Sequence, residues 1–266
     1  MTSCWIVVPT YDERENLRPI VQALLAALLP LTMRRTILIV DDDSPDGTGA
    51  IADQLAAEHL AVRVLHRPAK TGLAGAYQAG FALALDGGAD VVVQMDADLS
   101  HDPADVPRLV AALIDGADVA IGSRYVDGGG TAGWSPARRA LSRAGGRYAR
   151  LMLASSVYDL TGGFKAWRAE ALRQLPLDDL RAQGYAFQIE LTHLAERARL
   201  TVVEVPITFR ERIHGRSKMS TGIALEAMWG VPALRLRHRH DHAASRPPEP
   251  AVIAPRGVSG PAHLGS

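Results

Sequence analysis

The sequence is short of several features that mark common classes of protein. Cys4 is the only cysteine among 266 residues, which excludes an internal disulfide and a cysteine zinc site and indicates a reducing compartment such as the cytoplasm. Aromatic residues make up only 5%, and Lys plus Arg (29) equals Asp plus Glu (29). Neither base stacking nor net charge therefore favours a nucleic-acid partner, and we expect none.

Long hydrophobic runs and several nucleotide and hydrolase motifs are also missing. The longest largely apolar stretch, 20–31, is about half of the roughly 20 residues that a membrane-spanning helix needs, and the N-terminus lacks the pattern of a signal peptide. No G-x-G-x-x-G or G-x-x-x-x-G-K-[ST] follows the first apolar segment, and no G-x-S-x-G is found. These absences count against a spanning protein, a nicotinamide or P-loop enzyme and an esterase.

What is present is an alternation of short apolar runs and Ala/Leu-rich helical segments. Expected strands are 5–8, 36–40, 62–65, 90–95, 117–122 and 200–210, and expected helices are 15–29, 50–59, 73–87, 103–115 and 186–199, with a Gly-rich turn at 161–168. This alternation predicts an α/β fold with a mostly parallel sheet and helices on both faces. We expect one catalytic domain over 1–240 and a disordered, proline-rich tail over 241–266.

Polar segments follow most of the expected strands, at the edge where ligands bind in such sheets. Asp96 and Asp98 come directly after the fourth strand. Alone, this D-x-D pattern is as typical of a solvated turn or helix cap as of a site. Its position favours a site for a magnesium-type ion, which takes one or two carboxylates together with substrate phosphates.

Two more strand ends carry charged clusters. The segment 41–48 reads DDDSPDGT, in which Ser44 or Asp46 can cap a helix, while the run of three carboxylates is typical of contacts to a ribose or base edge. After the last strand, 209–219 holds Arg210, Arg212, Arg216 and Lys218. These cations indicate either a solvated loop or a clamp for phosphate groups.

The segment 134–158 contains five arginines and no acidic residue. Apolar residues interleave with the arginines at helical spacing, which predicts an amphipathic helix. Such a helix either packs against the domain or lies on an anionic membrane surface, and the arginines favour the membrane. The basic residues at 235–239 are expected to join this contact.

Several strings together resemble one family: VVPTYDERENL, VDDDSPDGT, MDADLSHDP, GSRYVDGGG, TGGFKAWR, GYAFQIEL and FRERIHGRSKM. From about residue 5 to about residue 230, the chain resembles the polyprenol-phosphate mannosyltransferases of the dolichol-phosphate mannose synthase type. These are inverting family-2 glycosyltransferases with a GT-A fold, and they serve protein glycosylation. The order and spacing of the strings make the resemblance far more specific than any one motif.

The resemblance implies a site, residue by residue. Donor-nucleotide contacts would come from Pro9, Tyr11, Glu13, Val40 and Asp42, and contacts to metal and diphosphate from Asp96, Ala97 and Asp98. Arg124, Arg212 and Lys218 would hold the donor and the acceptor phosphate, with Asp98, Arg212 and Lys218 most directly involved in catalysis. The implied donor is GDP-mannose, the cofactor Mg²⁺ or Mn²⁺, the acceptor a polyprenyl monophosphate and the product a β-linked mannosyl lipid.

The resemblance also implies peripheral association with the cytoplasmic face of a membrane, directly or through an anchoring partner protein. The chain departs from it at Ser100, where some relatives have a glutamine that ligates the metal. A phosphate acceptor is largely a dianion at neutral pH and needs no protein base. His101 and His214 are the nearest candidates for proton transfer, but we expect them to be structural or to support the residues that bind substrate. Transfer of glucose or another sugar, a non-catalytic binding subunit and a nucleotidyltransferase remain the alternatives.

Overall fold

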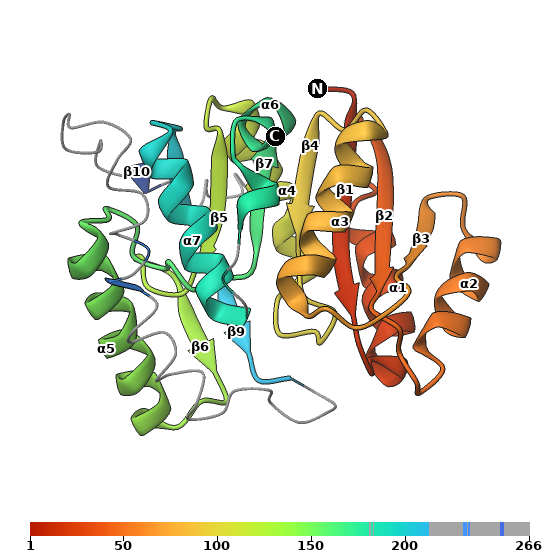
Figure 1. Ribbon diagram of the computed structural model, residues 1–266, viewed down its shortest axis with the longest axis horizontal. Helices are drawn as coiled ribbons and strands as arrows, with labels where there is room; N and C mark the ends of the chain where they lie inside the picture. The colour runs from red at the N-terminus through yellow and green to blue at the C-terminus, as the bar shows by residue number, and fades with distance from the viewer. Residues whose placement is uncertain (181, 183, 213–230, 233, 235–250, 253–266) are drawn as a thin grey trace, which may run out of the picture.

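The computed structural model describes residues 1–180, 182, 184–212, 231, 232, 234, 251 and 252 (Figure 1). Its strands are β1 (Ser3–Thr10), β2 (Arg34–Asp41), β3 (Val62–His66), β4 (Val91–Gln94), β5 (Val119–Ser123), β6 (Gly130–Ala132), β7 (Lys165–Arg168), β8 (Val202–Pro206), β9 (Thr208–Arg210) and β10 (Ala251–Val252). Its α-helices are α1 (Arg14–Ala27), α2 (Thr48–Glu58), α3 (Leu73–Asp86), α4 (Val106–Ile114), α5 (Pro136–Leu153), α6 (Ala169–Arg173) and α7 (Gly184–Arg197). Short 3₁₀ turns lie at Pro103–Asp105 and Leu177–Asp179.

Eight strands form the main sheet, in the order β10-β8-β5-β7-β4-β1-β2-β3. All neighbouring pairs are parallel except those of β7, which runs antiparallel to both β4 and β5. A second, two-stranded sheet pairs β6 with β9 in parallel. The prediction of a mostly parallel α/β fold is therefore confirmed.

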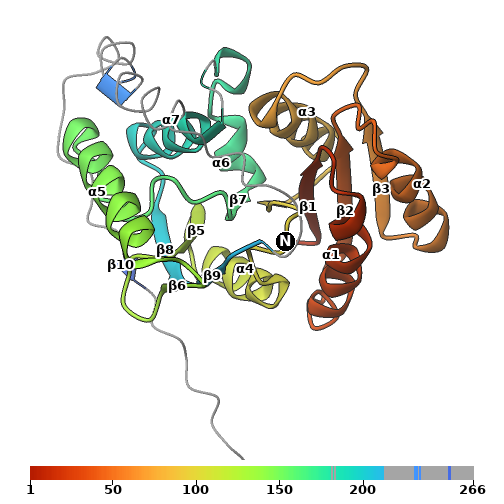
Figure 2. The ribbon, with the colours of Figure 1, turned by 90° about the horizontal axis from the view of Figure 1, so that it is seen from below.

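Helices cover both faces of the main sheet, as Figure 2 shows from below. On one face α1, α2 and α4 bury residues such as Leu17, Leu55 and Leu109 against alternate strand residues. On the other face α3, α6 and α7 cover the sheet, and α5 packs at its edge. Residues of the inner strands of the main sheet alternate between these two cores because successive side chains point to opposite faces, so both sides of these strands are largely apolar.

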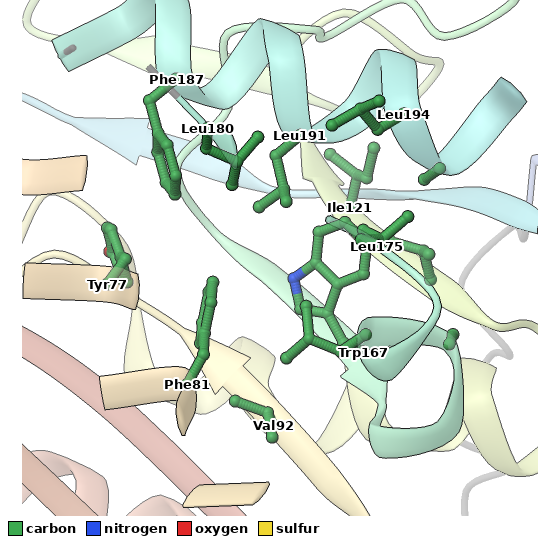
Figure 3. Packing of buried hydrophobic residues seen from close by; sticks show 14 of the residues in the cluster. Tyr77, Phe81, Val92, Ile121, Trp167, Leu175, Leu180, Phe187, Leu191 and Leu194 are labelled. Atoms are coloured by element: carbon green, nitrogen blue, oxygen red, sulfur yellow. The ribbon is translucent and has the colours of Figure 1, made fainter. Parts of the chain in front are cut away.

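The second core contains the aromatic residues that support the middle of the sheet (Figure 3). The ring of Tyr77 on α3 stacks against Phe81, with centroids 5.6 Å apart, and against Phe187 on α7, at 5.9 Å. Trp167 of β7 is fully buried, and its indole N–H donates to Gln94 Oε1 of β4 at 3.0 Å. These contacts anchor β4, which ends beside the D-x-D segment.

Two expectations about the second half of the chain were wrong. The expected turn at 161–168 ends in β7, which is inserted into the centre of the sheet. The expected strand at 200–210 is two strands, β8 in the main sheet and β9 in the small one, because the chain changes sheets at Ile207. The helix expected within 134–158 is confirmed as α5.

The boundary between a catalytic domain and a tail at residue 240 stays a prediction. Within 241–266 the structure describes only Ala251 and Val252, which pair with Val203 and Glu204 of β8. Of the helices in the described part of the chain, none is both long enough and apolar enough to cross a membrane.

Candidate functional site

The polar residues gather at the edge where the parallel strands end, the lower edge of the sheet in Figure 1. The register places Pro9 opposite Val40 and Val7 opposite Gln94, so the segments that follow β1, β2 and β4 begin at similar heights. Each of these segments contains a residue with positive φ, namely Asp12 (55°), Asp43 (60°) and Leu99 (60°). A left-handed leucine is uncommon, and strained backbone of this kind clusters at functional sites.

Asp96 follows β4 at the middle of this edge and is next to the aromatic core, which it contacts through Tyr77. Tyr77 Oη donates a hydrogen bond to Asp96 Oδ1 at 3.1 Å, and the tyrosine ring is held by Phe81 and Phe187. Burial, followed by the charge of Asp98, raises the pKa of Asp96 to about 6. Two carboxylates with this mutual repulsion are stabilised by a cation, so the pair favours cation binding.

Asp98 is buried and has both carboxylate oxygens engaged. Oδ1 accepts from the backbone N–H of Ser100 at 3.0 Å, and Oδ2 accepts from Arg212 Nη2 at 2.7 Å. Arg210 N–H, at the end of β9, donates to Ser100 O at 2.8 Å, which ties the segment carrying Arg212 to the segment carrying Asp98. The structure thus brings together two predicted site residues that are 114 positions apart.

The oxygen ligands at this edge fit a Mg²⁺ or Mn²⁺ ion whose coordination is completed by substrate and water. Asp96 and Asp98 offer two neighbouring carboxylates, and among the described residues no group of three or more His, Cys, Asp or Glu could hold a metal. Magnesium ions are commonly held by one or two carboxylates with substrate phosphates and water. The Oγ of Ser100 is buried and has no hydrogen-bond partner in the part of the chain that the structure describes, which leaves it available as a further oxygen ligand.

Asp42 holds the loop between β3 and α3. Its carboxylate accepts hydrogen bonds from Arg67 Nη1 and from the backbone N–H groups of Thr71 and Gly72, at 2.5 to 3.3 Å. The adjacent Asp41 accepts from the Thr10 hydroxyl at 3.3 Å. Two of the three consecutive carboxylates are therefore engaged in hydrogen bonds that shape the end of β2 and the loop before α3.

The other predicted donor contacts line the same edge. Pro9, Val40 and Ala97 are buried, and the Nζ of Lys70 lies 3.5 Å from the ring centroid of Tyr11. Glu13 is buried at the start of α1, where its carboxylate accepts from Asn16 Nδ2 at 2.7 Å. Asp46 accepts from Thr48 N–H at 2.9 Å, which confirms that it stabilises the start of α2.

Arg124 is part of a buried ion pair. Its guanidinium donates to both carboxylate oxygens of Asp159, at 2.7 and 2.6 Å, and to the hydroxyl of Thr161 at 2.7 Å. Burial alone would raise the pKa of Asp159, but the charge and hydrogen bonds of Arg124 outweigh it and lower this pKa. The structure therefore places Arg124 with Asp159 as well as at the end of β5.

The two histidines considered for proton transfer have different outcomes. His101 is buried between Phe164 and Phe209, with ring centroids 5.1 and 5.0 Å away, and burial lowers its pKa to about 4. A neutral histidine between aromatic rings is consistent with the expected structural role. His214 lies outside the described residues, as do Lys218 and Arg216.

Several residues of the site could not be found from the sequence. Tyr77, Arg67 and Asp159 contact the predicted site residues Asp96, Asp42 and Arg124. Lys165 of β7 is fully buried, and its Nζ donates to Gln188 Oε1 at 2.8 Å. The only sequence signal for any of them is the unusual string 161–168, which places Lys165 between two glycines and a tryptophan.

The α/β fold and the acid pair at the carboxyl edge of its sheet are typical of an enzyme site, and comparison with known proteins identifies the family. Residues 5–175 match the family model of glycosyl transferase family 2. The chain belongs to glycosyl transferase family 2. Its mostly parallel sheet, with helices on both faces, agrees with the GT-A fold that the resemblance implied.

Two relatives of known name are similar over most of their length. The undecaprenyl-phosphate mannosyltransferase of Micrococcus luteus is 47% identical over 232 residues, covering 85% of this chain and 93% of the relative. The polyprenol monophosphomannose synthase of Mycolicibacterium smegmatis is 46% identical over 239 residues, covering 90% of this chain and 89% of the relative.

Solved structures support the same fold. The glucosyl-3-phosphoglycerate synthase of Mycobacterium tuberculosis, solved with Mg²⁺ and uridine diphosphate, superposes with a TM-score of 0.65 at 19% identity, covering 88% of this chain and 79% of that one. The same enzyme with Mn²⁺, UDP-glucose and phosphoglyceric acid gives a TM-score of 0.64, also at 19% identity and the same coverage. At this identity the likeness is one of fold.

Proposed function

We propose that the chain transfers mannose from GDP-mannose to a polyprenyl monophosphate, giving polyprenyl-phosphate mannose and GDP. The observation that carries the proposal is the cluster of Asp96, Asp98 and Arg212 at the carboxyl edge of the sheet. The names of the two relatives, both near 47% identical, supply the sugar and the lipid class. The likeness in fold to an enzyme crystallised with Mg²⁺ and with Mn²⁺ supports a divalent cofactor.

In the proposed reaction an oxygen of the acceptor phosphate attacks C1 of mannose from the face opposite GDP. The new C1–O bond forms as the bond from C1 to the diphosphate oxygen breaks, so the configuration inverts and the electron pair leaves with GDP. The acceptor is already an anion near neutral pH, so no protein base has to remove a proton. The absence of a need for a base agrees with His101, which is buried and has a lowered pKa, so that it is a poor proton acceptor.

Different residues of the site would bind the metal ion, the phosphates and the nucleotide. Asp96 and Asp98 would hold the divalent ion, which when bound neutralises charge on the leaving diphosphate. Arg212 would bring positive charge to the phosphates, and Lys218, outside the described residues, is proposed to assist it. The loop held by Asp42, together with Tyr11 and Glu13, would receive the guanosine.

The lipid acceptor requires contact with a membrane surface, and α5 supports such a contact. One face of α5 is exposed and carries an apolar stripe, made of Ala137, Ala140, Leu141, Ala144 and Leu151. The opposite face packs against the domain through Gly146, Ala149 and Leu153. Exposed Arg139, Arg143 and Arg147 flank the stripe. We propose that α5 lies in the headgroup layer, with or without an anchoring partner protein.

A panel of donors tests the proposal. The protein is incubated with Mg²⁺ and a polyprenyl phosphate in separate reactions with GDP-mannose, UDP-glucose and other sugar nucleotides, and the lipid product of each is identified by mass spectrometry. We expect a hexosyl lipid and GDP from GDP-mannose. A product from UDP-glucose alone would identify a glucosyltransferase, release of pyrophosphate a nucleotidyltransferase, and binding without turnover a non-catalytic subunit.

A further inference from the structure

The ion pair between Arg212 and Asp98 engages Oδ2 of Asp98, an oxygen that a metal ion could also ligate. Arg212 Nη2 lies 2.7 Å from Asp98 Oδ2, and the side chains are only 22% and 9% exposed. The other oxygen, Oδ1, accepts from Ser100 N–H. A cation that ligates Asp98 through Oδ2 would lie beside the Arg212 guanidinium, so two positive charges would approach the same, largely buried carboxylate oxygen.

The surrounding charges make Arg212 the counter-charge of the acid pair. Arg212 Nη2 lies 2.7 Å from Asp98, and Asp96 is two residues before Asp98, so the guanidinium lies next to both carboxylates of the D-x-D segment. A divalent ion between Asp96 and Asp98 would supply the same compensation with twice the charge. The ion and the guanidinium would thus neutralise the same two carboxylates.

We propose that Arg212 and the divalent cation compete for Asp98, so that binding of the cation with the donor diphosphate transfers Arg212 from the carboxylate to a phosphate. The inference rests on the proposed function and assigns Arg212 a second task in the same site. Guanidinium groups bind carboxylate and phosphate in the same forked geometry, so the exchange replaces one strong partner by another.

The backbone around Arg212 is held in a way that restricts the exchange to its side chain. Arg210 N–H donates to Ser100 O at 2.8 Å, and β9 pairs with β6. Glu211 forms an ion pair with Arg138 of α5, with Nη1 and Oε1 2.8 Å apart. Arg212 therefore stays within reach of the acid pair while its long side chain changes partner.

Metal binding without donor or acceptor tests the competition directly. Free Mn²⁺ is measured by electron paramagnetic resonance during titration of the full-length protein and of its variants. We expect Arg212→Gln to bind Mn²⁺ about fivefold more tightly or better, the usual range for coupled binding events, while its turnover falls. Arg212→Lys, which keeps the charge with fewer donors, should lie between the two.

A matched control separates local exchange from a general change in charge. Arg210→Gln removes the same charge two residues away, from an exposed side chain, and should leave Mn²⁺ affinity within about twofold. Circular dichroism establishes that each variant is folded. Equal Mn²⁺ affinity in Arg212→Gln and the parent would overturn the competition while leaving the proposed transfer intact. Absence of Mn²⁺ binding by every protein, even with GDP, would overturn both the competition and the metal-assisted step.

Discussion

Asp98 connects the D-x-D segment to Arg212, and it supports a simple prediction. Asp98→Ala removes one of two carboxylates available to a divalent ion, along with the partner of Arg212. Loss of charge stabilisation on a leaving diphosphate is worth several kcal/mol, so we expect turnover to fall by about a hundredfold or more. The measurement is the initial rate of GDP release at saturating Mg²⁺.

The same substitution elsewhere provides the control. Asp86 is exposed at the end of α3, and Asp86→Ala should keep the parent rate. The thermal midpoint of both variants is measured to establish that they fold. Near-normal turnover of a folded Asp98→Ala protein would remove the D-x-D segment from the mechanism.

Asp159 supports a prediction about stability. It is fully buried and is bound through both oxygens by Arg124, and Glu204 holds its backbone N–H at 2.9 Å. Asp159→Asn keeps the shape but leaves the Arg124 charge without its carboxylate. Breaking a buried pair on one side costs about 3–5 kcal/mol, so we expect the free energy of unfolding to fall by that order.

Denaturant unfolding of the parent and of Asp159→Asn measures the loss. Glu58→Gln breaks an ion pair with Arg18 that is open to solvent, with side chains 38% and 47% exposed, and should change stability far less. If the two variants lost equal free energy of unfolding, the buried Arg124–Asp159 pair would contribute no more to stability than an exposed ion pair.

At the scale of elements, the sequence predicts those strands and helices whose signal is local. Every strand and helix expected before residue 123 is present, because short apolar runs and Ala/Leu-rich helical segments are signals that a few neighbouring residues carry by themselves. The exception with the greatest consequence is β7. Its four residues include Lys165 and Arg168 and follow two glycines, so the string is typical of a turn. Only pairing with β4 and β5, far away in sequence, makes it a strand.

The element α5 carries the prediction about the membrane. Its exposed apolar stripe lies opposite the stripe that packs on the domain, and Leu141 and Leu151 are 68% and 74% exposed. Replacing Arg139, Arg143 and Arg147 by Glu should release the protein from anionic vesicles, because each basic residue near such a surface contributes about 1 kcal/mol. Binding of the parent should weaken as salt rises. Co-sedimentation with anionic liposomes measures both effects.

A control with the same change in net charge tests the location. Arg34, Arg63 and Arg173 are exposed on β2, β3 and α6, and their replacement by Glu should leave vesicle binding close to the parent. Equal sedimentation of the α5 variant and the parent at low salt would show that α5 is not the contact. The basic residues 235–239, which lie outside the described residues, would then be the next segment to test.

At the scale of the whole molecule, the candidate site was predictable where it depends on strand ends. Asp96, Asp98 and Asp42 follow strands, and a parallel sheet brings strand ends together whatever the rest of the chain does. Tyr77 and Asp159 could not be predicted, because they reach the site from the interior of a helix and from a loop, and neither could Lys165, which lies in an unexpected strand. Their partners are defined by packing across the two cores rather than by spacing along the chain.

Lys165 gives the molecule a pH-dependent stability that the site's function does not require. It is fully buried in the centre of the sheet, and its Nζ donates to Gln188 O and Oε1 at 3.2 and 2.8 Å. Burial, opposed by the charges of Asp159 and Asp96, lowers its pKa to about 7. In the unfolded chain a lysine keeps a pKa of about 10.4.

The sign of the effect follows from the number of bound protons. Between about pH 7 and pH 10 the unfolded chain holds a proton on Lys165 that the folded protein has released, so folding becomes more favourable as pH rises. Lys165→Met removes this titration, whereas other groups such as Cys4 titrate in both proteins and cancel in the difference. The parent should therefore gain stability over Lys165→Met by up to about 1.4 kcal/mol for each pH unit in this window. Urea unfolding of both proteins at several pH values from 7 to about 9.5 measures the difference, and a difference that stays flat would mean that Lys165 remains charged in the folded sheet.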